Sequence, residues 1–65
     1  MIVGELYYSL NSGRIYRYDE EVKGQHSLVI IKPGPNEPEY MKGRCLEYRG
    51  LCPLMLIPAT KDHWK

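Results

Sequence analysis

Two compact apolar runs stand out in the pattern of hydrophobic and polar positions. Leu28–Ile31 is followed by Lys32-Pro33, and Leu54–Ile57 lies between two prolines. Both runs are too short to span a membrane, and neither has the spacing of an amphipathic helix. They therefore predict two buried β-strands.

The N-terminal part of the chain predicts a β-hairpin. Leu6–Leu10 and Arg14–Tyr18 alternate in polarity, as strands with one buried face do. Asn11-Ser12-Gly13 lies between them and supplies a turn in which glycine can adopt a positive φ. In the second strand, Tyr16 and Tyr18 share one face and Arg17 points to the other. Because the two tyrosines are interleaved with Arg14 and Arg17, we expect their rings to be difficult to bury completely.

A polar segment and a proline-rich segment flank the first apolar run. Asp19–Gln25 predicts a loop, and His26–Lys32 predicts the strand that follows it. Proline cannot donate a ladder hydrogen bond, so Pro33–Pro38, with three prolines, ends this strand. We expect this segment to be an exposed, projecting loop.

The C-terminal part predicts a second hairpin. Arg44–Tyr48 and Leu51–Ile57 flank Arg49-Gly50, which supplies the turn. Pro53 places the first residues of the returning strand at an edge or a bulge.

A last short element completes the predicted fold. Thr60 can cap a helical turn over residues 61–64, with Trp64 packed back onto the core. Together the elements predict a single small, mostly β domain over residues 1–65. The fold class is a five-stranded SH3-like barrel or a strongly bent antiparallel sheet, with a short C-terminal helical turn.

The aromatic composition indicates a half-buried ring surface. The chain of 65 residues has six tyrosines, one tryptophan and no phenylalanine, so every aromatic ring carries a polar group. The net charge is +1 and the charges are scattered. This balance does not favour strong attraction to nucleic acid or to an anionic membrane.

The start of the chain bears on location. Met1–Gly4 lacks the basic start and the apolar stretch of a secretory signal, and no segment is long enough for a transmembrane helix. We therefore expect a cytoplasmic protein without membrane association.

The cysteines and histidines are the residues to test as metal ligands. Cys45 and Cys52 are expected to face each other across the C-terminal hairpin, where a disulfide is geometrically possible; without an export signal, reduced and partly buried thiols are favoured over that disulfide. Structural zinc sites present closely spaced ligand pairs, whereas His26 and His63 lie far apart in sequence. The sequence therefore predicts no metal site and no cofactor.

Catalytic signatures are weak throughout the sequence. Ser9, Ser12, Ser27 and Thr60 lack a nucleophile motif, and Gly34 lies among prolines rather than before a helix. Short chains also rarely enclose a substrate pocket. We therefore expect a protein that is not an enzyme.

Tyrosine and arginine content favours recognition of another molecule. Both residue types are enriched at protein-binding hot spots. Pro35-Asn36-Glu37-Pro38 also fits the P-x-x-P spacing of proline-rich ligands. The expected binding residues are Arg14, Tyr16, Arg17, Tyr18, Pro35, Pro38, Tyr40 and Tyr48.

Three functional hypotheses follow from these patterns. The first is a protein-binding module that acts as an adaptor or as an inhibitor of a larger protein, a kind of chain common among phage and mobile-element products. The second is a nucleic-acid-binding module that stacks bases on tyrosines, although the near-neutral charge weighs against it. The third is a homo-oligomer that pairs through an exposed edge strand at Leu28–Ile31.

Overall fold

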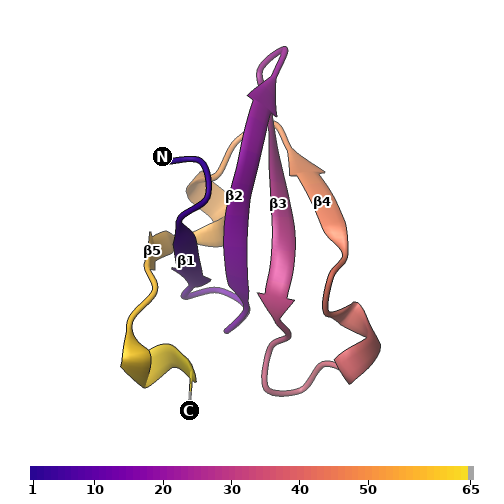
Figure 1. Cartoon of the computed structure of the whole chain (residues 1–65), viewed down its shortest axis with the longest axis vertical. Helices are drawn as coiled ribbons and strands as arrows, with labels where there is room; N and C mark the ends of the chain where they lie inside the picture. Colours follow the sequence, from indigo (N-terminus) through magenta and orange to yellow (C-terminus); the bar gives the residue numbers. More distant parts are fainter. Residues whose placement is uncertain (65) are drawn as a thin grey trace.

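Five antiparallel strands form one sheet in the computed structural model, which describes residues 1–64 (Figure 1). The strands are β1 (Leu6–Ser9), β2 (Ile15–Val22), β3 (Gln25–Lys32), β4 (Cys45–Tyr48) and β5 (Leu56–Pro58). Their order in the sheet is β4-β3-β2-β1-β5, and within residues 1–64 the sheet is not closed. The predicted mostly β class with five strands is confirmed.

Three short 3₁₀ turns connect or follow the strands. They are η1 (Glu39–Met41), η2 (Cys52–Leu54) and η3 (Lys61–Trp64). The last of these confirms the predicted C-terminal helical turn. None of the helical segments in residues 1–64 has the length and apolar character needed to cross a membrane.

The predicted N-terminal hairpin is confirmed. β1 pairs with β2 from Leu6↔Arg17 to Tyr8↔Ile15, and Gly13 in the turn has a φ of 77°. The buried hydroxyl of Ser9 donates to the Leu54 carbonyl at 2.7 Å. This bond ties the end of β1 to η2.

The predicted loop at Asp19–Gln25 is wrong. β2 continues to Val22 and β3 begins at Gln25, so only Lys23-Gly24 connects them. These two residues have φ values of 52° and 79°, which suits a two-residue hairpin turn that follows the strand twist. The outer end of β2 is exposed, so a strand there needs no apolar residues.

The predicted C-terminal hairpin is also wrong. β5 pairs with β1, not with β4, and places Ile57 opposite Tyr8. Pro53 lies in η2, where its missing N–H costs nothing. Met55 then takes a left-handed conformation and turns the chain into β5. The apolar run Leu54–Ile57 is therefore divided between a helical turn and a short strand.

The first apolar run lies at the centre of the sheet. Leu28 pairs with Tyr18 on β2 and with Leu46 on β4, and Leu28 and Ile30 are fully buried. The prediction of a buried strand is confirmed. The expectation that Leu28–Ile31 forms an exposed edge is wrong, because β3 has a neighbour on each side.

Two of the six tyrosines belong to the core. Tyr16 is fully buried and Tyr18 is 4% exposed, and both pack with Leu28, Ile30 and Leu54. The expectation that these two rings resist burial is wrong. Each ring can be buried because its hydroxyl group finds a polar partner at the core boundary, which removes the cost of burying it.

A smaller packed region lies outside this core. Ile15 is fully buried beside Tyr8 in the β1–β2 register. The His63 ring of η3 stacks on the Tyr8 ring with centroids 4.0 Å apart. Trp64 is 42% exposed, so the prediction that Trp64 packs back onto the core is wrong. The ring of η3 that packs against the sheet is His63.

Candidate interaction surface

An ion pair fixes the proline-rich loop, residues 33–38, against the start of β2. The Arg14 guanidinium donates from Nε to both carboxylate oxygens of Glu37, at 2.7 and 2.9 Å, and Nη2 also donates to Oε2. The same carboxylate accepts the Gly34 N–H at 2.7 Å. Two elements far apart in sequence are therefore joined by a bidentate contact, which is the strongest arrangement for such a pair.

The ion pair changes the titration of both partners. Hydrogen bonds from Arg14 and then from Gly34 lower the pKa of Glu37 from 4.5 to about 2. The hydrogen bond to Glu37 raises the pKa of Arg14 above its ordinary value. Both groups therefore remain charged across the physiological range.

A hydroxyl pair extends this contact into the sheet. Arg14 Nη1 donates to the Tyr16 hydroxyl at 3.0 Å, and the Tyr48 hydroxyl lies 3.4 Å from that of Tyr16. Burial and then the hydrogen bond with Tyr16 raise the pKa of Tyr48 to about 12. The Tyr48 hydroxyl thus stays neutral and remains a hydrogen-bond donor.

Close packing holds the loop on the β1–β2 turn. A Cβ atom on Gly13 would lie 2.7 Å from Cδ of Pro35, and one on Gly34 would lie 2.5 Å from the Ser12 carbonyl oxygen. Only glycine permits these approaches. Pro35, Asn36 and Pro38 are exposed, as predicted, but Gly34 is buried and Glu37 is half-buried, so the loop is anchored against the sheet rather than projecting from it.

The anchored loop and η1 together present apolar groups to solvent. Pro35 and Pro38 are exposed, and the extended Pro38 leads directly into η1. Tyr40 on η1 is 75% exposed, the largest exposed fraction among the exposed large hydrophobic side chains of residues 1–64. We call Pro35, Pro38 and Tyr40 the loop surface.

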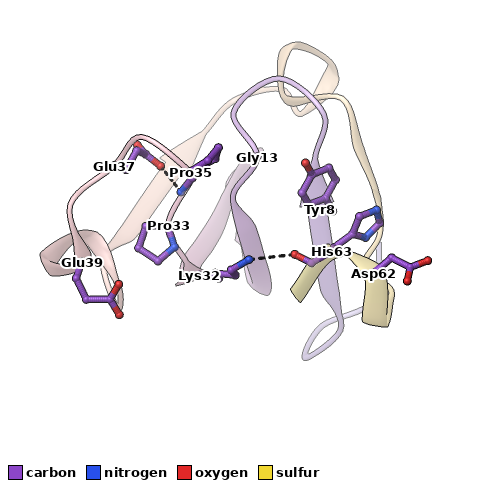
Figure 2. A pocket seen from close by; sticks show the side chains of 10 residues that line it. Tyr8, Gly13, Lys32, Pro33, Pro35, Glu37, Glu39, Asp62 and His63 are labelled. Carbon is purple, nitrogen blue, oxygen red and sulfur yellow. Dashed lines mark hydrogen bonds between the residues drawn. The ribbon is translucent and has the colours of Figure 1, made fainter. Parts of the chain in front are cut away.

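A cleft of about 420 Å³ lies beside the loop surface (Figure 2). Pro33 and Pro35 line one side, and the stacked Tyr8 and His63 line the other. Lys32 at its base donates to the His63 carbonyl at 3.2 Å. This bond links the end of β3 to η3 below the cleft.

The structure separates the residues expected to bind. It brings together Arg14, Pro35 and Pro38 around the loop, and Tyr40 follows on η1. Arg17 is exposed on β2 and Tyr48 is half-buried on β4. Tyr16 and Tyr18 lie in the core, so their ring faces are not available to a partner.

Sequence reasoning missed Glu37 and Gly13 as residues that position this surface. Nothing in the sequence around Glu37 indicates which cation pairs with its carboxylate, because Arg14 lies 23 positions away. Gly13 was expected to serve the turn alone, whereas it also makes room for Pro35.

Both cysteines and both histidines lie in separate surroundings. Cys45 and Cys52 are free and exposed, so the expected placement across a hairpin and the expected partial burial are wrong. His26 Nδ1 lies 2.8 Å from the Tyr18 hydroxyl, and His63 Nδ1 accepts the Thr60 N–H at 2.9 Å. No group of three or more His, Cys, Asp or Glu side chains in residues 1–64 is arranged to hold a metal ion.

Comparisons with family models, with curated proteins and with solved structures find no match for this chain. A functional proposal must therefore be argued from the surface chemistry of the chain itself.

Proposed function

We propose that this protein is a non-enzymatic protein-binding module that uses the loop surface, as an adaptor or an inhibitor would. The observation that carries the proposal is the Arg14–Glu37 ion pair. The ion pair fixes the loop that carries the exposed Pro35 and Pro38. This loop contains three prolines, which restrict its backbone, and it leads directly into the exposed Tyr40.

Anchoring lowers the entropy that a loop loses when it binds, so more of the contact energy appears as affinity. Tyrosine adds a large ring with few rotatable bonds, and such rings dominate binding energy at interfaces. The loop surface combines both properties.

Binding of single-stranded nucleic acid is a weaker second candidate. Stacking needs exposed rings along one groove, whereas Tyr16 and Tyr18 are buried. Phosphate contact also supplies most of the affinity of such modules, and the net charge here is only +1.

The test is capture of a binding partner from an extract of the source cells by the immobilised protein, with mass spectrometry of what is retained. We expect one protein to be retained at a defined ratio and to be lost with Tyr40→Ala or Pro38→Ala. Val22→Ala is the matched control, because Val22 is also exposed but lies near the β2–β3 turn, at the other end of the sheet (Figure 1).

Equal retention by Tyr40→Ala, Pro38→Ala and Val22→Ala would contradict the proposal. If binding is instead to random single-stranded nucleic acid and falls steeply with salt, the second candidate replaces it.

A further inference from the structure

The C-terminal turn η3 contacts the sheet through His63. The His63 ring stacks on the Tyr8 ring of β1, with centroids 4.0 Å apart and planes inclined by 4°. The His63 carbonyl accepts from Lys32 Nζ at the end of β3, at 3.2 Å. Figure 2 shows His63 beside Tyr8, with the bond from Lys32, on the side of the cleft that η3 provides. The position of this wall of the cleft therefore depends on His63.

The same side chain caps the start of η3. Thr60 directly precedes η3, and its backbone N–H donates to His63 Nδ1 at 2.9 Å. The His63 N–H donates in return to the Thr60 carbonyl at 3.0 Å. In a capping box, a Glu or Gln at the third helical position accepts from the backbone N–H of the capping residue. His63 holds that position in η3 and supplies the acceptor.

The charge on His63 determines whether this acceptor exists. A backbone N–H can only donate, so His63 Nδ1 carries no proton and the ring is neutral, with its proton on Nε2. Uptake of a second proton turns Nδ1 into a donor that faces the Thr60 N–H, and the bond is lost. Histidine is the side chain whose charge ordinarily changes between pH 5 and 8. The cap of η3 thus requires conditions in which the ring is neutral.

His26 gives a comparison within the same chain. Its Nδ1 lies 2.8 Å from the Tyr18 hydroxyl, which can either donate or accept. The Glu21 carboxylate lies 3.7 Å from His26 Nε2. Both contacts are compatible with a protonated His26 ring, whereas the contact of His63 with Thr60 is not. The two histidines therefore predict different structural responses to acid.

The charged groups around His63 act on its ring in opposite directions. Among residues 1–64, those on the surrounding elements are Lys32 on β3, Lys61 and Asp62 on η3, and Glu37 and Glu39 across the cleft. The lysines disfavour a protonated ring and the carboxylates favour it, as does the face of Tyr8. The Thr60 hydroxyl oxygen lies 3.4 Å from Nδ1, which is long for a bond that would replace the lost one. The Thr60 N–H therefore loses its acceptor whichever charges dominate.

We propose that η3 is a pH-sensitive lid on the cleft, closed over Tyr8 while His63 is neutral and released when its imidazole takes up a proton. Release removes the His63 side of the cleft and exposes the face of Tyr8 that the stack covers. The loop side of the cleft stays in place, because Glu37 keeps its charge and its bonds to Arg14 in this pH range. The proposal does not depend on partner binding by the loop surface.

The test uses Trp64, which is the single tryptophan of the chain and lies next to His63 on η3. Quenching of its fluorescence by acrylamide is measured from about pH 7.5 to about pH 5, the range in which histidine titrates. Trp64 is 42% exposed with the lid closed, so release should raise the quenching constant about two-fold. The Thr60 amide resonance should shift over the same range, while far-ultraviolet circular dichroism shows that the sheet persists.

Three variants separate the cap from the stack. His63→Gln supplies an amide oxygen that accepts at every pH, so quenching should stay low throughout. His63→Phe keeps a ring for Tyr8 without an acceptor, so quenching should be high at both ends of the range. His26→Gln is the matched control, because it removes the other histidine and should keep the wild-type transition.

Constant quenching of wild-type Trp64 across this range would overturn the proposal. A transition that persists in His63→Gln, or that disappears in His26→Gln, would do the same, because another group would then control η3. Low quenching in His63→Phe at neutral pH would show that the stack holds η3 without the bond from Thr60, which also contradicts the proposal.

Discussion

Glu37 joins two distant parts of the chain through one carboxylate. It accepts from the Arg14 guanidinium at the start of β2 and from the Gly34 N–H within the loop. Because the prolines around it have no N–H to donate, the Glu37 carboxylate supplies polar contacts that its proline neighbours cannot.

The ion pair predicts an acid-dependent loss of stability. The pKa of Glu37 is about 2 in the folded protein and near 4.5 when unfolded, so the unfolded state binds the proton first as pH falls. The stabilisation is complete above about pH 4.5 and is lost as pH falls towards about 2. Urea unfolding followed from pH 7 to about pH 2.5 should show this decline.

Glu37→Gln should remove this part of the pH dependence and cost about 1–2 kcal/mol at pH 7, since the pair is partly exposed to solvent. Glu20→Gln on the exposed outer end of β2 is the control and should change little. A Glu37→Gln variant that keeps the wild-type slope as pH falls from 4.5 towards about 2 would contradict the assignment.

The burial of Tyr16 and Tyr18 could not be predicted from the sequence. Their alternation with Arg17 predicts that the two rings share a face, but not which face is covered. The decision comes from partners elsewhere in the fold: Arg14 and Tyr48 reach the Tyr16 hydroxyl, and His26 reaches that of Tyr18.

Among the connecting elements, two glycines with nearly the same backbone angles should respond differently to alanine. Gly13 and Gly24 have φ values of 77° and 79°, but only Gly13 has a neighbour within 4 Å of the added carbon, with Pro35 at 2.7 Å. Gly24→Ala should therefore cost about 1 kcal/mol from backbone strain alone.

Gly13→Ala should cost about 2 kcal/mol or more, because the loop must also move away from the turn. Chemical denaturation of the two variants measures the difference, and the amide resonances of Gly34, Asn36 and Glu37 in the loop should shift only for Gly13→Ala. Equal losses would mean that the contact with Pro35 does not constrain the loop.

The strands could be predicted where a turn-forming residue lies between two segments of alternating polarity, as Gly13 does in the β1–β2 hairpin. They were not predictable at the outer part of β2–β3, where Lys23 adopts the positive φ that is usually left to glycine or asparagine. The same holds for Met55, whose left-handed conformation divides an apolar run that otherwise predicts one strand.

For the whole molecule, the topology leaves the two thiols on separate exposed elements. Cys45 lies on β4 and Cys52 on η2, and both are free. Titration of the native protein with a thiol reagent should therefore detect two reactive groups per chain without denaturant. Alkylation should leave the far-ultraviolet circular dichroism unchanged, and a reaction as slow as global unfolding would contradict this exposure.

Strand order was the global property that sequence patterns predicted least well. Five short β elements indicated a bent sheet or a barrel, and the structure confirms that class. However, a pattern of alternation gives no information about which strands are neighbours, so the sequence predicts β5 beside β4, whereas β5 lies beside β1. The partner of Arg14 and the anchored loop surface were unpredictable for the same reason, since both depend on contacts between distant segments.

The pairing of β1 with β5 also sets the order in which the protein can fold. β2, β3 and β4 follow one another along the chain and meet through comparatively local contacts, whereas Tyr8 meets Ile57 only after a long loop has closed. During synthesis, β1 can join β2 early, but its other side has no partner until residues 56–58 leave the ribosome. In a nascent chain paused before that point, β1 would be unpaired on one side in addition to β4, and its free backbone groups could pair with other chains.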